Sequence, residues 1–319
     1  MTQEKGLQYF PIALFSSVMG VSGVAISLRL VEDLWVNRFI ASNVLTGLAT
    51  FMFIINAVIL IYRLAYHLDE VKQDYQHPLK MNFFGAISIS LLLLAVLYYN
   101  FNETLSFYVW LAGAILQVGL TLKVLTTLIW ERTLEVSQFN AAWVIPIVGN
   151  IVVPLAGVLH VDAVINWIFF SIGISFSVFY FTIFIFRMFF YPTPPAKLRP
   201  TLFILLAPPG VGFVSYIKLA GNMDAFAYIL YGVAFYIGML FIYQIKRFIA
   251  APFSVAWWAF LFPSAAVTNA TIYLYEGVDA AYLTWLIYAQ VVALLLLTLF
   301  LLFRTIQLAI NMSLFTKER

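Results

Sequence analysis

The sequence contains no cysteine, only three histidines and little charge. Charged residues occupy 10% of the 319 positions, against about 25% in a soluble domain. Hydrophobic residues occupy 64%, and the mean hydropathy is +0.97. The absence of cysteine excludes disulfides and thiolate metal sites. The low charge and the long apolar runs predict a polytopic membrane protein.

Signatures of common enzyme classes are also missing. The sequence has no P-loop, no GxSxG and no HExxH motif. His67, His77 and His160 lie in or near predicted loops, and none has a second ligand type at helical spacing. We therefore expect no metal, no cofactor and no enzymatic activity. The net charge of +3 follows the membrane topology and does not suggest a nucleic-acid partner.

The apolar runs are long enough for ten transmembrane helices, because one span needs about 20 residues. The predicted spans are 10–30, 42–64, 82–99, 105–129, 141–159, 163–188, 200–219, 224–246, 254–274 and 281–304. The connections from odd to even spans are mostly short. We therefore expect one all-α transmembrane domain, 1–319, made of five αα-hairpins near 10–64, 82–129, 141–188, 200–246 and 254–304.

Lysine and arginine are unevenly distributed between the two sides of this arrangement. The chain has 17 lysines and arginines. Three of them, Arg29, Arg38 and Lys218, lie on the side opposite the termini, and Lys123 lies inside the fourth span. The other thirteen lie on the side of the termini. The positive-inside rule then predicts that both termini are cytoplasmic. We expect a multi-pass protein of the inner (plasma) membrane.

Within the spans, proline is confined to odd-numbered segments. Pro11 lies in the first, Pro146 and Pro154 in the fifth, Pro208 and Pro209 in the seventh, and Pro263 in the ninth. Proline removes a backbone donor and bends a helix, and lipid cannot satisfy the carbonyl that is freed. We therefore expect kinked odd-numbered helices inside, around a central pore, with the even-numbered helices outside.

Small and hydroxyl residues accumulate in the same odd-numbered spans, whereas carboxylates are missing from the span interiors. The absence of carboxylates from the span interiors argues against a proton relay or an acidic cation filter. Small residues also serve helix packing, so each has two readings. The pore-lining or kink candidates are Pro11, Ser17, Gly20, Ser88, Pro146, Asn150, Pro154, Pro208, Val211, Ser215, Pro263, Ala266 and Asn269.

Few cations lie in or near the spans. Lys123 lies roughly 9 Å from the centre of the fourth span, so it either snorkels to the surface or pairs locally, or it helps to attract an anion. Arg29, Lys218 and Arg304 lie at span ends and are interpreted as interface anchors. This interpretation leaves the conduit without a fixed charge.

Several segments resemble one family. Phe253–Tyr273, FSVAWWAFLFPSAAVTNATIY, resembles the ninth helix of the plant slow-type guard-cell anion channels, with its pattern FxVAWWAxxFPxxAxxxAT. Leu68–Pro78, LDEVKQDYQHP, resembles the end of helix two in the bacterial TehA proteins. The segments at 6–14 (GLQYFPIAL) and 206–216 (LAPPGVGFVSY) resemble helices one and seven of those proteins. The similarity covers nearly the whole chain and identifies it as a member of the tellurite-resistance/dicarboxylate transporter family.

The resemblance implies ten helices in five hairpins and a homotrimer with one pore per subunit. It also implies that the phenylalanine of the WWAxxF motif, here Phe262, plugs the pore, next to Pro263. One position departs from the pattern, because Pro11 stands where we expect glycine. A basic position in the bacterial relatives matches Lys123.

Two functions remain open. The first is a passive channel for small monovalent anions such as nitrate and chloride, in which an uncharged conduit favours anions that lose water easily. The second is a carrier or exporter for C4-dicarboxylates such as malate, for sulfite or for tellurite. Both readings have anions and membrane lipid as partners.

Overall fold

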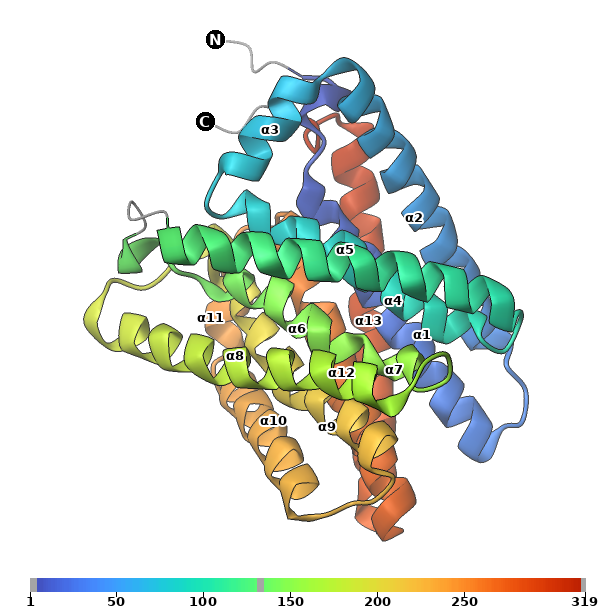
Figure 1. Cartoon of the computed structure of the whole chain (residues 1–319). Helices are drawn as coiled ribbons and strands as arrows, with labels where there is room; N and C mark the ends of the chain where they lie inside the picture. The colour runs from blue at the N-terminus through green and yellow to red at the C-terminus, as the bar shows by residue number, and fades with distance from the viewer. Residues whose placement is uncertain (1–4, 131–134, 317–319) are drawn as a thin grey trace.

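The computed structural model describes residues 5–130 and 135–316, which are almost entirely helical (Figure 1). The only β-type pairing in these ranges is a single bridge between Lys5 and Thr316. Beside it, the Gly6 amide donates to the Phe315 carbonyl at 3.0 Å. The two ends of the described chain therefore lie together, at the end of the bundle that carries α3 (Leu68–Gln76). We call this the terminal end and the opposite one the distal end.

Nine helical segments of the described chain are long and apolar enough to cross a membrane. They are Ile12–Trp35, Ile40–Tyr66 (α2), Lys80–Tyr98, Glu103–Trp130 (α5), Ala163–Phe190 (α8), Ala196–Ala220, Ala225–Tyr243 (α10), Val255–Val278 and Ala281–Ile310 (α13). The short helix η1 (Leu7–Tyr9) precedes the first segment, and η4 (Val136–Gln138) and α11 (Ile245–Ile249) lie in connections.

The predicted fifth span is the exception. It is a shorter segment, Ala141–Gly157, made of η5 (Ala141–Val144), α6 (Ile145–Val152) and α7 (Pro154–Gly157). The sequence-based count of ten spans thus corresponds to nine long helical segments and one short, interrupted one.

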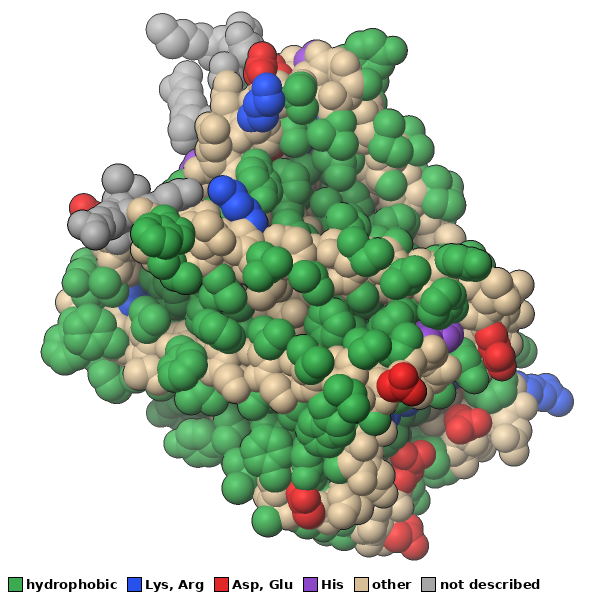
Figure 2. Space-filling model, in the orientation of Figure 1, with side chains coloured by type: hydrophobic (Ala, Val, Ile, Leu, Met, Phe, Trp, Pro, Cys, Tyr) green, Lys and Arg blue, Asp and Glu red, His purple; other side chains and the backbone are tan. Residues whose placement is uncertain are grey.

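Burial alternates along the chain. In Ile12–Trp35, Lys80–Tyr98, Ala196–Ala220 and Val255–Val278, 72% to 83% of the most apolar stretch is buried, and every residue of Ala141–Gly157 is buried. The corresponding share is 17% to 33% in α2, α5, α8, α10 and α13. The odd-numbered segments are therefore the inner set, as the proline pattern predicted. The face of α5 and α8 seen in Figure 2 is mostly hydrophobic, and acidic side chains gather toward its distal end.

Each inner segment begins as a 3₁₀-helix and continues as an α-helix. The pairs are η2 (Ile12–Leu14) with α1 (Phe15–Trp35), η3 (Lys80–Phe84) with α4 (Gly85–Tyr98), η5 with α6, η6 (Ala196–Leu206) with α9 (Ala207–Ala220), and η7 (Val255–Phe260) with α12 (Leu261–Val278).

The prolines lie at these starts. Pro146, Pro208 and Pro263 occupy the first turn of their α-helices, where the backbone amide has no intrahelical partner. Pro11 precedes η2, and Pro154 opens α7. The predicted kinks are thus changes of helix type or new helix starts, and not bends inside continuous α-helices.

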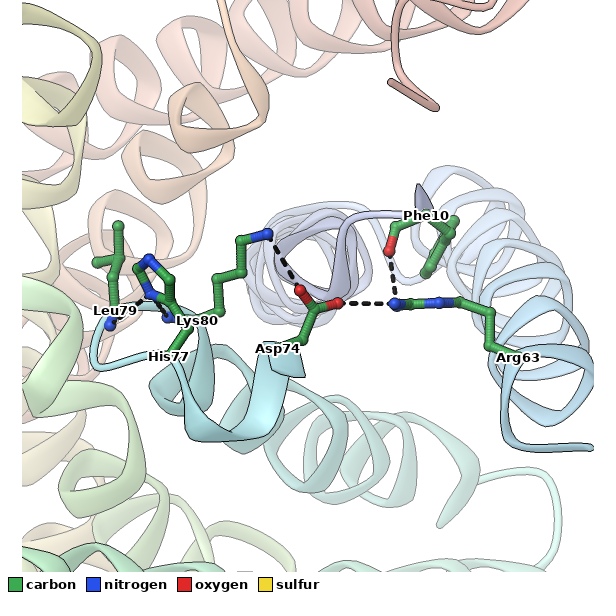
Figure 3. Close-up of polar contacts among 6 residues, drawn as sticks. All are labelled: Phe10, Arg63, Asp74, His77, Leu79 and Lys80. Carbon is green, nitrogen blue, oxygen red and sulfur yellow. Dashed lines mark hydrogen bonds and ion pairs between the residues drawn. The ribbon is translucent and has the colours of Figure 1, made fainter. Parts of the chain in front are cut away.

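Charged side chains fasten the first inner segment at the terminal end (Figure 3). Arg63 of α2 donates from Nη1 to the Phe10 carbonyl at 2.8 Å and from Nη2 to Oδ2 of Asp74, in α3, at 2.7 Å. The other oxygen of Asp74 accepts from Lys80 Nζ at 3.0 Å. One carboxylate thus joins α3 both to α2 and to the start of η3.

Candidate functional site

A cavity of about 660 Å³ opens at the distal end, among all five inner segments. Each segment contributes to its wall: Gly23 from α1, Leu93 from α4, Leu155 from α7, Val211 from α9 and Phe262 from α12. Loop residues such as Tyr99 and Phe101 form its rim. The walls below the rim are apolar apart from Asn269, whose Oδ1 accepts from Ser27 Oγ at 2.6 Å.

A second cavity, of only about 20 Å³, lies nearer the starts of the inner segments. Its wall includes Ser16, Met19, Val148, Trp258 and Pro263. This volume is close to that of one probe-sized water. Within the described part of the chain, Phe262 is the one residue that lines both cavities, and it is buried. Its side chain therefore lies between the wide distal space and the narrow space beyond it.

Two glycines of α1 allow α12 to bring Phe262 to this position. A Cβ at Gly23 would lie 3.0 Å from the Cβ of Ala265 and 3.4 Å from Cδ2 of Phe262. A Cβ at Gly20 would lie 2.8 Å from Cδ2 of Leu261. Small residues permit such close approach of two helices in a membrane. Gly20 therefore acts in packing and lines neither cavity.

Two cations line the mouth of the large cavity, Arg29 and Lys218, together with one carboxylate, Asp33. Arg29 donates to the Leu97 carbonyl and to Asn43 Oδ1, both at 3.1 Å. Lys218 Nζ lies 5.7 Å from the centre of the Tyr273 ring. No carboxylate of the described residues lies within 4.0 Å of either cation.

The guanidinium of Arg29 is also held between two aromatic rings. Its Cζ lies 5.4 Å from the centre of the Phe39 ring and 5.3 Å from that of Phe101. Both are within the range of cation–π attraction. The side chain is thereby fixed at the mouth without losing its charge.

Arg29 and Lys218 were expected to be interface anchors, with no fixed charge along the conduit. The structure corrects this expectation, because both side chains line the mouth of the large cavity. A signal for Lys218 was present in the sequence, because it follows the pore-lining candidate Val211 by seven residues. Seven residues are two turns of an α-helix, so the two side chains share a face. Gly23 and Leu30 of α1 show the same spacing, Ile26 lies three residues after Gly23 on the same face, and all three line the cavity.

The structure divides the sequence candidates into two groups. Phe262, Val211, Ala266 and Asn269 line the large cavity, and Phe262 and Pro263 line the small one. The others line neither cavity: Pro11, Ser17, Gly20, Ser88, Pro146, Asn150, Pro154, Pro208, Ser215 and Lys123.

The polar members of the second group bond to neighbouring segments or to their own helix. Ser17 Oγ donates to the Leu14 carbonyl at 2.7 Å, and Ser215 Oγ to the Ile151 carbonyl at 2.6 Å. Lys123 is exposed on the outer helix α5. The two serine hydroxyls therefore bond to backbone carbonyls inside the bundle, as buried polar groups must in a membrane, whereas Lys123 lies on the outer surface.

A polar network between α4, α5 and α6 accounts for three more candidates. Ser88 Oγ donates to Gln117 Oε1 at 2.8 Å, and Gln117 Nε2 donates to the Pro146 carbonyl. Asn150 Nδ2 donates to Thr121 Oγ1 at 2.8 Å. The network ties the inner segment Ala141–Gly157 to its outer neighbour α5, and sequence reasoning missed Gln117 and Thr121.

His160 lies in the distal loop beside Leu159, which lines the cavity. Its Nε2 is 2.8 Å from Ser106 Oγ, and the rings of Tyr99, Phe107 and Trp110 surround it at 5.7 to 6.0 Å. Burial lowers the pKa of His160 below its usual value, and the charge of Glu103 opposes this in part. Across the described residues, no group of three or more histidine and acidic side chains could hold a metal ion.

The sequence matches known proteins over almost its entire length. Residues 9–306 match the profile of the SLAC1 family, described as voltage-dependent anion channel. The chain is 26% identical to an uncharacterized transporter of Methanocaldococcus jannaschii, with 85% of each chain covered. It is 23% identical to the tellurite resistance protein TehA homolog of Haemophilus influenzae, covering 84% of this chain and 82% of the homolog.

The plant relatives are longer than this chain. It is 25% identical to the S-type anion channel SLAH2 of Arabidopsis thaliana, covering 82% of this chain but 52% of the plant protein. The match to the family profile extends from the first inner segment into α13 and so includes both cavities. The chain therefore belongs to the SLAC1 family of voltage-dependent anion channels, together with the TehA homolog.

Proposed function

We propose that the protein is a passive, anion-selective channel for small monovalent anions such as nitrate and chloride. The path begins at the distal mouth, runs through the large cavity, passes Phe262 and continues through the small cavity toward the terminal end. The observation that carries this proposal is that, of the described residues, Phe262 alone lines both cavities, at the centre of five inner segments whose most apolar stretches are at least 72% buried. A ring in that position can gate by obstruction or by dewetting.

The charges of the site favour anions over cations. Arg29 and Lys218 outnumber the single carboxylate of the mouth, Asp33, and this excess of positive charge raises the local concentration of anions. Below the mouth, Leu93, Val211 and Ala266 offer no charge to replace the water that an ion loses. Selectivity should then follow the cost of dehydration, with nitrate preferred to chloride.

The topology belongs to the same proposal. Ten crossings in five hairpins require that the short segment Ala141–Gly157 counts as the fifth crossing, and its complete burial supports this. Both termini would be cytoplasmic, because thirteen of the 17 lysines and arginines belong to that side. We further propose a homotrimer in the inner membrane, on the resemblance to the family.

Planar-bilayer recording of the purified protein tests the gate. Phe262→Ala should raise nitrate and chloride currents strongly, because it removes the ring between the two cavities. Phe260→Ala is a matched control, since Phe260 packs against Phe203, with centroids 4.6 Å apart, and lines neither cavity. Unchanged currents in a folded Phe262→Ala protein would contradict the assignment of Phe262 as the gate. Currents carried equally by cations would contradict the assignment of an anion channel.

A carrier is the second candidate, since two cations line one cavity and could hold both charges of a C4-dicarboxylate or of a sulfite or tellurite anion. The names of two relatives, a transporter and a tellurite resistance protein, point the same way. Reconstituted vesicles separate the two functions. A channel passes anions without a pH gradient and far faster than a carrier turns over, whereas a carrier saturates with its substrate.

A further inference from the structure

We propose that the large distal cavity is a binding site for amphiphilic organic monoanions, namely carboxylates or sulfonates with an apolar body. The charged head group lies between Arg29 and Lys218, and the body extends down the wall toward Phe262. The binding itself is independent of ion conduction. Only its consequence for conduction rests on the proposed channel function.

The size of the cavity is the first argument. Its volume of about 660 Å³ would hold roughly twenty waters at about 30 Å³ each. A single nitrate or chloride ion fills little of such a space and makes no close contact with most of the wall. Sites for organic ligands of moderate size have volumes of about 300–1,000 Å³, and this cavity falls within that range.

The distribution of polar groups is the second argument. The charged residues of the wall, Arg29, Asp33 and Lys218, all lie at the mouth. The deeper wall is formed by Leu93, Leu155, Val211, Val214 and Ala266, with Phe262 at its base. An apolar pocket with a few polar groups at one end selects a ligand with the same division of character.

The unused donors at the mouth are the third argument. Arg29 uses Nη1 and Nη2 for neutral acceptors, and no carboxylate of the described residues lies within 4.0 Å of its guanidinium. Lys218 has an aromatic contact but no hydrogen bond or ion pair within the same part of the chain. A carboxylate or sulfonate supplies several oxygens and would satisfy such donors with charge-assisted bonds.

The narrow space beyond Phe262 explains why such a ligand should stop there. The cavity on that side has a volume of about 20 Å³, too small for a ring system. A bound organic anion would therefore fill the distal cavity without passing through it. In a conducting channel it would block small anions from the distal side.

The test uses equilibrium binding to the purified full-length protein in detergent. The probes are naphthalene-2-carboxylate, its neutral analogue naphthalene-2-carboxamide, and acetate, which has the head group alone. We expect the carboxylate to bind about tenfold more tightly than either other probe, the ratio that corresponds to one good charged contact. Equal affinity for the carboxamide would indicate partition into apolar surface or detergent and would overturn the proposal.

Variants locate the bound probe. Arg29→Gln and Lys218→Gln should each weaken carboxylate binding about fivefold or more and leave carboxamide binding nearly unchanged. Val211→Phe, which fills the cavity, should weaken binding of both naphthalene probes. Lys123→Gln is the charge-matched control, because Lys123 is exposed on α5 outside the cavity. Affinities unchanged by the first three variants would place the ligand elsewhere and overturn the site.

The outcomes for binding and for conduction can be told apart. One result is a protein that binds the probe with the expected dependence on charge and on the cavity variants, yet passes no current. That result would support the binding site and contradict the proposed channel function. The opposite result is a protein that does not bind naphthalene-2-carboxylate and whose anion currents are unaffected when the compound is added on the distal side. That result would support the channel and contradict the binding site.

Discussion

The side chain of Gln117, on the outer helix α5, lies so close over Gly149, on the inner helix α6, that a Cβ at residue 149 would overlap its carboxamide. The same carboxamide accepts from Ser88 Oγ and donates to the Pro146 carbonyl. The absence of a side chain at Gly149 therefore lets an outer helix reach the backbone of an inner segment that begins with a 3₁₀ turn.

Gly149→Ala should destabilise the protein by about 1–3 kcal/mol, because the added methyl displaces Gln117 and breaks its hydrogen bonds. Thermal melting in detergent measures the loss. Gly232→Ala is the control, since Gly232 on α10 has open space around it and should be neutral or slightly stabilised. A wild-type melting temperature for Gly149→Ala would contradict the role of this contact.

Removing either mouth cation should reduce anion conductance, most strongly at low ionic strength. We expect Arg29→Gln and Lys218→Gln each to lower it roughly threefold at about 0.01 M salt, with little effect near 1 M, where the Debye length is about 3 Å. Arg38→Gln is the matched control, because Arg38 is exposed near the same end but does not line the cavity. An equal loss at all salt concentrations would point to altered structure instead of lost attraction.

The contact between Arg63 and Asp74 should contribute strongly to stability. The Arg63 side chain is 1% exposed and that of Asp74 15%. Arg63→Met should cost about 3 kcal/mol, the low end for breaking a buried pair, because Asp74 keeps Lys80 as a partner. Chemical denaturation of Arg63→Met and of Lys72→Gln, each compared with the wild type, measures the two changes in the free energy of unfolding.

Lys72 belongs to an exposed pair with Asp69, so its removal should change stability by less than about 1 kcal/mol. Equal effects of Arg63→Met and Lys72→Gln would show that burial adds nothing to the first pair.

Stability should fall as the pH decreases through the range in which His160 titrates. Burial lowers the pKa of His160 in the folded protein, whereas the unfolded chain titrates near about 6.5. Below that pH the unfolded chain binds a proton that the folded protein resists, so stability present above about pH 6.5 is lost on acidification. Melting temperatures of the wild type and His160→Gln between about pH 7.5 and pH 5 measure this, with a shallower decline expected in the variant. Parallel declines would assign the effect to other groups.

Proline positions and hydropathy were enough to predict which segments are buried. Pro146, Pro208 and Pro263 lie in inner segments, as expected, since lipid disfavours unsatisfied backbone. The exact form of those segments was not predictable. Sequence patterns do not distinguish a 3₁₀ start from an α-helical one, and Ala141–Gly157 proved shorter than a usual span.

The membrane class, the inner and outer sets of segments and the family followed from the amino-acid sequence, because hydropathy, proline and the WWAxxF motif are local properties of the chain. That Lys218 faces the cavity, while Ser215 on the same helix bonds to the Ile151 carbonyl, depends on how the segments pack against one another. Helical spacing shows which side chains share a face. The packing of all five inner segments sets the rotation of each helix and therefore decides which face meets the cavity.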